Sequence, residues 1–241
     1  MKVIVRDTAL EAQALVAERI IGVLASRPSP VLGLATGGTM RPVYDALVES
    51  YRAGRVTFKA ATTFNLDEYY PLGPDHPDSY RTFMRAALFD RVDIEPYNTH
   101  LPLGDCHNPI AEAQRYESLI DATGGIDLQL LGIGLNGHIG FNEPGTSPWS
   151  RTRLVTLAPA TREANAGTLK MLDKTPERAI TMGIATIMDA RQCVLLATGP
   201  HKAAVVKRMV EGPVHPDCTA SVLQRHPATT VVLDRAAAAE L

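Results

Sequence analysis

The chain has 241 residues, 45% of them hydrophobic and 21% charged, which is the size and composition of one large globular α/β domain. A net charge of −2 without a basic stripe argues against a nucleic-acid partner. No apolar run reaches the ~18 residues of a membrane span. The N-terminal residues do not resemble a signal peptide. The three cysteines lack metal-like spacing, so we expect a cytoplasmic, single-domain protein over residues 1–241 with no metal and no membrane partner.

Apolar runs bounded by Gly or Pro predict strands, and apolar residues spaced three or four apart predict helices. In the first half of the chain we expect a strand at 2–5, a helix at 8–26, a strand at 30–35, a helix near 41–53, a strand ending near 65, and helices at 79–90 and 108–120. In the second half we expect strands at 126–134, 152–158 and 178–184, a helix at 184–190 and a strand at 192–199. Helices at 200–211 and 219–225 and a strand at 229–234 complete the prediction. Continuously apolar strands that alternate with helices predict an open, largely parallel sheet with helices on both faces.

Four polar motifs directly follow predicted strands: "TGGT" (36–39), "NLDEYY" (65–70), "LNGHIGFNEP" (135–144) and "TGPHK" (198–202). In parallel α/β sheets, ligands bind beyond the carboxyl ends of the strands. We therefore expect these motifs to converge on one edge of the sheet.

Two of the motifs suit an anion. Residues Thr36, Gly37, Gly38 and Thr39 form a strand–loop–helix turn whose backbone N–H groups and hydroxyls fit a phosphate, although a tight turn without a ligand explains the glycines equally well. The motif lacks both the Walker and the dinucleotide-binding patterns, so neither ATP nor NAD is indicated. Lys202 lies in the first turn of another predicted helix, where a cation is unfavourable unless an anion is near; the alternative is a solvent-exposed lysine.

Adjacent carboxylates stand at Asp67 and Glu68, just past a strand. On an extended backbone they point to opposite sides, so we expect one to face a pocket and the other to serve the structure. A carboxylate in a closed pocket has a raised pKa and can act as a general base, whereas a loop carboxylate that caps backbone amides is the alternative.

The stretch "LNGHIGFNEP" gives the strongest local signal. His138 has glycines on both sides, with Asn136 and Glu143 close by, and an orienting acceptor such as Glu143 makes a histidine a useful acid–base group. A structural histidine in a loop is the alternative. The ligand-rich "PDHPD" at 74–78 is better explained as a surface loop than as a metal site.

Taken together, "LGLATGGT", "FNLDEYY", "HPDSYRTFM", "NGHIGFNEP", "SRTRLVTL", "TREAN" and "TGPHKA" resemble glucosamine-6-phosphate deaminases, in the same order and over nearly the whole chain. The resemblance implies a Rossmann-like fold and conversion of glucosamine 6-phosphate and water to fructose 6-phosphate and ammonia. It implies no cofactor, because proton transfers by side chains suffice for this chemistry.

The resemblance also implies roles for individual residues. Asp67 would carry the proton from C2 to C1, and His138 would open the sugar ring with support from Glu143 and Asn136. Residues Thr36–Thr39 and Lys202 would hold the phosphate. The expected partner is thus a small sugar phosphate, and the expected state a monomer or small homo-oligomer.

The sequence departs from the family pattern at three places. Asn136 stands where many relatives have Asp, and an amide can only orient His138, because it does not titrate. Gly167 stands near the position of an expected phosphate-binding arginine, for which Lys170 or Arg162 could substitute. Val155 interrupts a basic pair found in allosteric relatives, so we expect no activation by an N-acetylated sugar phosphate.

Two other functions fit parts of the pattern. 6-Phosphogluconolactonases share the fold but follow the histidine with Ser-Leu-Phe-Pro rather than "GFNEP". Sugar-phosphate sensors of transcription regulators carry a helix-turn-helix module, for which we find neither room nor a basic patch.

Overall fold

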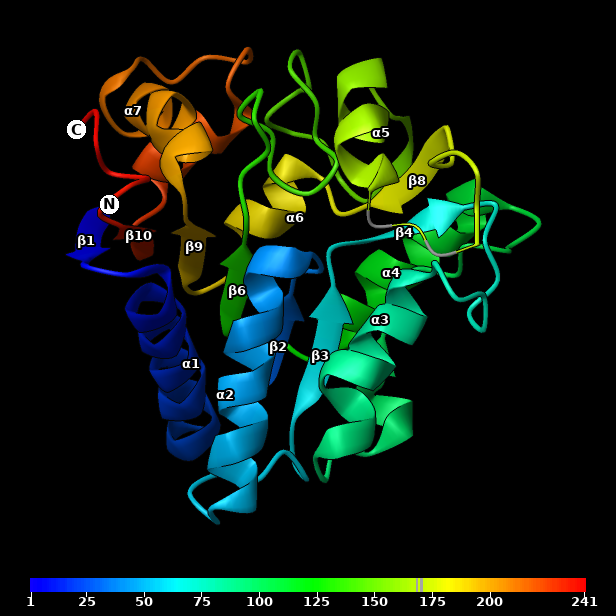
Figure 1. Cartoon of the computed structure of the whole chain (residues 1–241). Coiled ribbons are helices and arrows are strands. Elements are labelled where there is room, and N and C mark those ends of the chain that lie inside the picture. Colours follow the sequence, from blue (N-terminus) through cyan, green and yellow to red (C-terminus); the bar gives the residue numbers. More distant parts are fainter. Residues whose placement is uncertain (168, 170) are drawn as a thin grey trace.

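A seven-stranded sheet forms the centre of the protein (Figure 1). The computed structural model describes residues 1–167, 169 and 171–241. All neighbouring strands of this sheet run parallel, in the order β1-β10-β9-β6-β2-β3-β5. The strands are β1 (Lys2–Arg6), β2 (Val31–Leu34), β3 (Thr62–Asn65), β5 (Thr99–His100), β6 (Leu128–Leu131), β9 (Cys193–Ala197) and β10 (Thr229–Asp234). This arrangement confirms the predicted parallel α/β sheet.

The apolar runs in the sequence correspond to the strands at the centre of this sheet. Every residue of β2, β6, β9 and β10 is buried. Strands covered on both faces need apolar side chains at every position, which explains the absence of alternation. The strand expected at 126–134 is shorter, because glycines follow it at Gly132 and Gly134.

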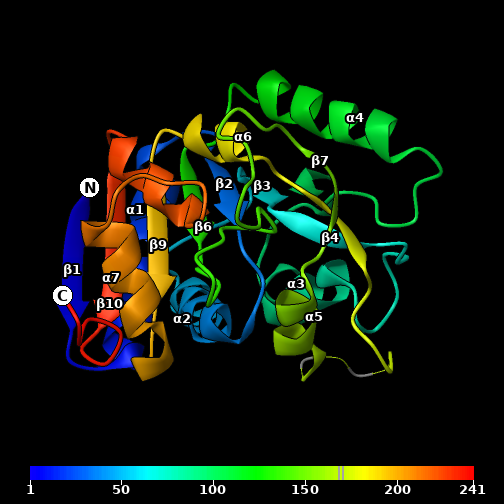
Figure 2. The same cartoon turned by 90° about the horizontal axis from the view of Figure 1, so that it is seen from above.

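Helices cover both faces of the sheet. Figure 2 shows α2 (Arg41–Arg52) and α3 (Tyr80–Ala87) on one side, with α4 (Pro109–Ala122) and α6 (Ile184–Met188) on the other. The longest helix, α1 (Ala9–Ser26), packs against α2, and α7 (Ala203–Glu211) follows β9. Among the described residues, none of the helices has the length and apolar character needed to cross a bilayer.

Residues at the helix termini explain where several helices begin. The Thr8 hydroxyl accepts from the Glu11 amide at 3.2 Å, and the Glu11 carboxylate accepts from the Thr8 amide in return. The predicted Asn108 cap accepts from the amides of Ile110 and Ala111, both at 3.1 Å. Such caps satisfy amides that the helix itself leaves without partners.

A second, three-stranded sheet was not predicted. Strands β4 (Asp67–Tyr70), β8 (Arg178–Thr181) and β7 (Arg153–Thr156) pair antiparallel in the order β4-β8-β7. Two of the predicted strands, 152–158 and 178–184, thus lie outside the main sheet. A short helix, α5 (Pro159–Ala166), follows β7, and the helix expected at 219–225 is a 3-10 helix.

The order of the strands brings the four polar motifs together. Strands β9, β6, β2 and β3 are neighbours in the sheet, and each is followed by one of the motifs. The chain leaves β2 towards β3 and β5 on one side, whereas β6 leads to β9 and β10 on the other. The boundary between β2 and β6 is therefore the switch point where open α/β sheets bind ligands.

Candidate active site

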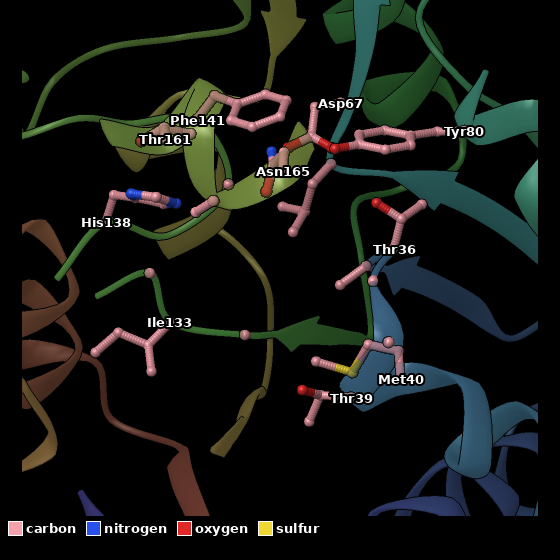
Figure 3. Close-up of a pocket in the computed structure, with 18 of the residues that line it drawn as sticks. Thr36, Thr39, Met40, Asp67, Tyr80, Ile133, His138, Phe141, Thr161 and Asn165 are labelled. Atoms are coloured by element: carbon pink, nitrogen blue, oxygen red, sulfur yellow. The ribbon is translucent and has the colours of Figure 1, made fainter. Parts of the chain in front are cut away.

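A cavity of about 880 Å³ opens at this switch point. Figure 3 shows His138 on one side of it, and Thr36 and Thr39 on another. Eight of the nine predicted site residues line the cavity: Thr36, Gly37, Gly38, Thr39, Asp67, Asn136, His138 and Lys202. Glu143, the ninth, lies outside the lining and accepts a hydrogen bond from the side chain of Asn136, which does line the cavity.

The glycine-containing turn joins β2 to α2. Gly37 has a φ of 116°, a conformation that strongly favours glycine. The Met40 amide donates to the Gly37 carbonyl at 3.1 Å, which begins a 3-10 turn over Gly38–Met40. The turn and the start of α2 face the cavity, in an arrangement typical of anion binding.

Lys202 enters the cavity from the loop after β9. The Gly199 amide, at a φ of 90°, donates to both carboxylate oxygens of Asp234 at 3.0 Å. The Lys202 ammonium donates to the Ile133 carbonyl at 2.7 Å, at the end of β6. Burial lowers the pKa of Lys202, so a nearby anion would stabilise its charge.

Asp67 and Glu68 serve different purposes, as their alternation predicts. Asp67 faces the cavity. Glu68 accepts from the amides of Tyr69 and Tyr80, both at 2.9 Å, and from the Arg81 amide at 3.0 Å. It therefore caps the N-terminus of α3, where a carboxylate is favourable.

Burial is the main cause of an unusually high pKa for Asp67. Its side chain is only 6% exposed, and desolvation, with a further contribution from the Glu68 charge, raises its pKa to about 8. A hydrogen bond with Thr181 acts in the opposite direction. A carboxyl group with such a pKa can accept and return a proton near neutral pH.

Thr181 on β8 contacts both halves of the site. It is the register partner of Asp67, and its hydroxyl also accepts from the Phe141 amide at 3.1 Å. One residue on, the Met182 carbonyl accepts from the Asn142 side-chain amide at 2.8 Å. Strand β8 thus holds the loop that carries the histidine as well as the strand that carries Asp67.

His138 is oriented by a chain of two side chains, Asn136 and Glu143. Its Nδ1 lies 2.7 Å from Oδ1 of Asn136, and Nδ2 of Asn136 donates to Oε2 of Glu143 at 2.7 Å. The same Glu143 oxygen lies 3.5 Å from Nδ1. Asn136 is thus the nearer partner, and because its Oδ1 accepts, Nδ1 of a neutral His138 carries the hydrogen and Nε2 is left for a ligand.

Glu143 is fixed on its other side by α5. Its Oε1 accepts from the Thr161 hydroxyl at 2.5 Å and from the Ala158 amide at 3.3 Å. Burial acts to raise the pKa of Glu143, but hydrogen bonds with His138, Thr161 and Asn136 outweigh it and lower the pKa to about 2. Glu143 therefore stays ionised across the neutral range and stabilises a positive charge on the imidazole.

The comparisons with known proteins agree with this geometry. The family described as glucosamine-6-phosphate isomerases/6-phosphogluconolactonase matches residues 5–234. The chain belongs to this family. A glucosamine-6-phosphate deaminase of Rhodopirellula baltica is 53% identical over 95% of this chain and 92% of its own length. One of Hahella chejuensis is 48% identical over 100% of this chain and 92% of its own length.

Two solved structures repeat the fold. A monomeric glucosamine-6-phosphate deaminase superposes with a TM-score of 0.98 at 43% identity, over the full length of both chains. A 6-phosphogluconolactonase of Trypanosoma brucei superposes with a TM-score of 0.76 at 22% identity, over 100% of this chain and 98% of its own. At that identity the second likeness concerns the fold alone.

Arg162 and Lys170 were the two residues expected to replace the phosphate-binding arginine that is missing near Gly167. Arg162 lies outside the cavity lining and pairs with Glu177 at 3.2 Å, so in this structure it does not replace the arginine. Lys170 lies outside the described residues.

Several lining residues of this family member were not predicted. Tyr80 and Phe141 lie close together, with ring centroids 6.2 Å apart, and Figure 3 shows them near Asp67. Arg41, at the first position of α2, also lines the cavity. Gly134 was missed as well: a Cβ there would lie 2.2 Å from Cε1 of the His138 ring. Only the position of Gly134 within "GIGLNGH", four residues before the histidine, could have indicated it.

Proposed function

We propose that this protein is a glucosamine-6-phosphate deaminase that converts glucosamine 6-phosphate and water to fructose 6-phosphate and ammonia. The observation that carries the proposal is the presence of Asp67, the supported His138 and the Thr36–Thr39 turn with Lys202 around one cavity. The reaction needs an acid–base group at the ring oxygen, a proton carrier at C2 and C1, and an anchor for the phosphate. The nearby curated relatives favour this activity over lactone hydrolysis.

Ring opening is assigned to His138. With Nδ1 donating to Asn136, Nε2 can take the proton of the anomeric hydroxyl and return it to the ring oxygen as the C1–O5 bond breaks. The imidazolium that forms between these steps is stabilised by ionised Glu143, 3.5 Å from Nδ1. Asn136 transmits orientation but adds no charge of its own.

Proton transfer is assigned to Asp67. As a carboxylate it removes the C2 proton of the open-chain sugar while the C1 carbonyl oxygen gains a proton, which gives an enolamine. The protonated carboxyl then delivers a proton to C1 as the nitrogen, having lost one proton, forms a double bond to C2. Water adds to this imine and converts it to the ketone with release of ammonia. The pKa of about 8 makes this carboxylate more basic than an ordinary aspartate, which suits removal of a weakly acidic C–H proton.

Phosphate binding is assigned to the Thr36–Thr39 turn and Lys202. A dianionic group held there contributes binding energy that positions C1 and C2 beside Asp67. Lys202 arrives from β9 and the turn from β2, on either side of β6, so the phosphate would lie at the switch point.

We also infer that the protein acts as a monomer or a small homo-oligomer, that an N-acetylated sugar phosphate does not activate it, and that it works in the cytoplasm. A solved relative of similar length is described as monomeric. Light scattering coupled to size exclusion tests the oligomeric state, and the rate of ammonia release with and without the N-acetylated sugar phosphate tests the absence of activation.

The activity is tested by ammonia release from a panel of hexosamine 6-phosphates, together with hydrolysis of 6-phosphogluconolactone. We expect glucosamine 6-phosphate to react fastest, and Asp67→Asn to lower kcat by several orders of magnitude with little change in the binding of fructose 6-phosphate. Lactone hydrolysis without ammonia release would contradict the proposal, and near-normal turnover by Asp67→Asn would contradict the role of that residue.

A further inference from the structure

The phosphate site as assigned above has a shortage of positive charge. A sugar phosphate carries close to two negative charges at neutral pH, whereas Lys202 is the one cation among the predicted phosphate ligands. Arg162 is paired with Glu177 outside the cavity lining. Among the described residues, a second cation for the phosphate must come from elsewhere in the lining.

Arg41 is such a residue. It lines the cavity as the first residue of α2, two positions after Thr39. Its guanidinium carbon lies 4.9 Å from the centroid of the Phe83 ring, and Phe83 lines the same cavity. Stacking on an aromatic face fixes the plane of a guanidinium and leaves its N–H edge available for an oxyanion.

The charge of Arg41 is not neutralised by the protein. Within the described part of the chain, no carboxylate lies at ion-pair distance from it. Asp45, four residues further along α2, pairs instead with Arg91 at 2.7 Å. The first turn of α2 contains no acidic residue. A cation at a helix N-terminus is electrostatically unfavourable, and a bound anion would reverse the sign of that interaction.

We propose that Arg41 binds the phosphate group of the substrate together with Lys202 and the Thr36–Thr39 turn. The Thr36–Thr39 turn and Arg41 belong to one continuous segment after β2. An anion bound to the turn would therefore lie beside a segment that also carries the guanidinium. Phe83 positions the arginine, because α3 presents its ring beneath the guanidinium plane. This inference rests on the proposed function for the identity of the sugar phosphate, whereas the placement of the exposed Arg41, Lys202 and the turn around one cavity is observed.

Arg41 acts mainly through binding rather than through the chemical steps. It lies on the turn that would hold the phosphate, whereas proton transfer is assigned to Asp67 and His138. A contact made equally in the ground and transition states changes KM and leaves kcat nearly constant. Loss of a charge-assisted hydrogen bond typically corresponds to about a tenfold change in affinity.

The test compares Arg41→Gln with Arg52→Gln, which removes the same charge from the exposed C-terminal end of the same helix. Isothermal titration with inorganic phosphate and with fructose 6-phosphate measures binding without turnover. We expect the dissociation constants to rise about tenfold in Arg41→Gln and to change less than about twofold in Arg52→Gln. Arg41→Lys, which keeps the charge but loses the planar fork, should give an intermediate value.

Kinetics separate this inference from the proposed function. If the wild-type protein releases ammonia from glucosamine 6-phosphate, KM should rise about tenfold in Arg41→Gln with kcat within about twofold of wild type. If the wild-type protein releases no ammonia, the proposed function fails, and the phosphate titration still decides the role of Arg41. Equal phosphate affinity in wild type and both Arg41 variants, or equal losses in Arg41→Gln and Arg52→Gln, would overturn the inference.

Discussion

Replacing Asp67 with asparagine should stabilise the protein while it removes activity, and the gain should grow with pH. Desolvation raises the pKa of Asp67 to about 8, against an ordinary value of 3.8 that also applies to the unfolded chain. Because the folded-state pKa is the higher one, the stability that protonated Asp67 contributes is present in full below about pH 4 and is lost as the pH rises towards 8. Asparagine has nearly the same shape and carries no charge to desolvate.

The size of the effect follows from the shift. At about 1.4 kcal/mol per pH unit, the free energy of unfolding of the wild type should fall by about 4 kcal/mol relative to Asp67→Asn between pH 5 and pH 8. For a chain of this length, that corresponds to a relative change in melting temperature of about 10 °C. Thermal unfolding of both proteins at pH 5, 6, 7 and 8 measures the difference.

Asp127→Asn is the matched control. Asp127 is equally buried, at 5% exposure, but it accepts from the Val31 amide at 2.9 Å and pairs with Arg27 and Arg191 at 3.4 and 3.3 Å. Its replacement should destabilise the protein across the same pH range, because Arg27 and Arg191 lose the negative charge that they pair with. If wild type and Asp67→Asn instead lose stability in parallel from pH 5 to pH 8, the side chain of Asp67 is not the desolvated acid described here.

Two further changes test the support of the catalytic groups. Thr181→Val removes a hydrogen bond that lowers the pKa of Asp67, so the acidic limb of the pH profile of kcat/KM should move to higher pH; an unchanged limb would show that this bond does not tune the base. Gly134→Ala should lower kcat by about a hundredfold, because the added Cβ would lie 2.2 Å from the His138 ring. Gly132→Ala is the control and should be tolerated, because its Cβ would meet only the flexible end of a methionine side chain at 3.4 Å. Equal activity of the two glycine variants would refute the contact.

The sequence predicted the central sheet well for a physical reason. Strands such as β6 and β9 are covered on both faces, so burial alone requires an unbroken apolar run that is visible in the sequence. Strand β7 is only partly buried, and β4 mixes carboxylates with tyrosines. Strand β4 pairs with β8 across more than a hundred residues of chain, and β7 pairs with β8 across a segment that includes helix α5. No local pattern in the sequence specifies either pairing.

The candidate site divides in the same way. His138 was identifiable because it stands among glycines directly after an apolar strand, and Asp67 because adjacent carboxylates directly follow a predicted strand. Arg41 and Tyr80 carry no such signal, since an arginine or a tyrosine at the start of a helix is ordinary, and only the folded chain places them around the cavity. The order of the partners on His138 was also beyond the sequence, because the 2.7 Å contact with Asn136 depends on the conformation of the loop.

The position of Thr181 between Asp67 and the loop of His138 has a consequence for how activity can change. Its hydroxyl interacts with the carboxyl group on one side and accepts from the Phe141 amide on the other. A displacement of β8 would therefore move the proton carrier and the ring-opening loop together and alter both rates at once. Selective adjustment of one step must come from residues beyond this strand, and for ring opening these are the partners of Glu143, Thr161 on α5 and Ala158 directly before it.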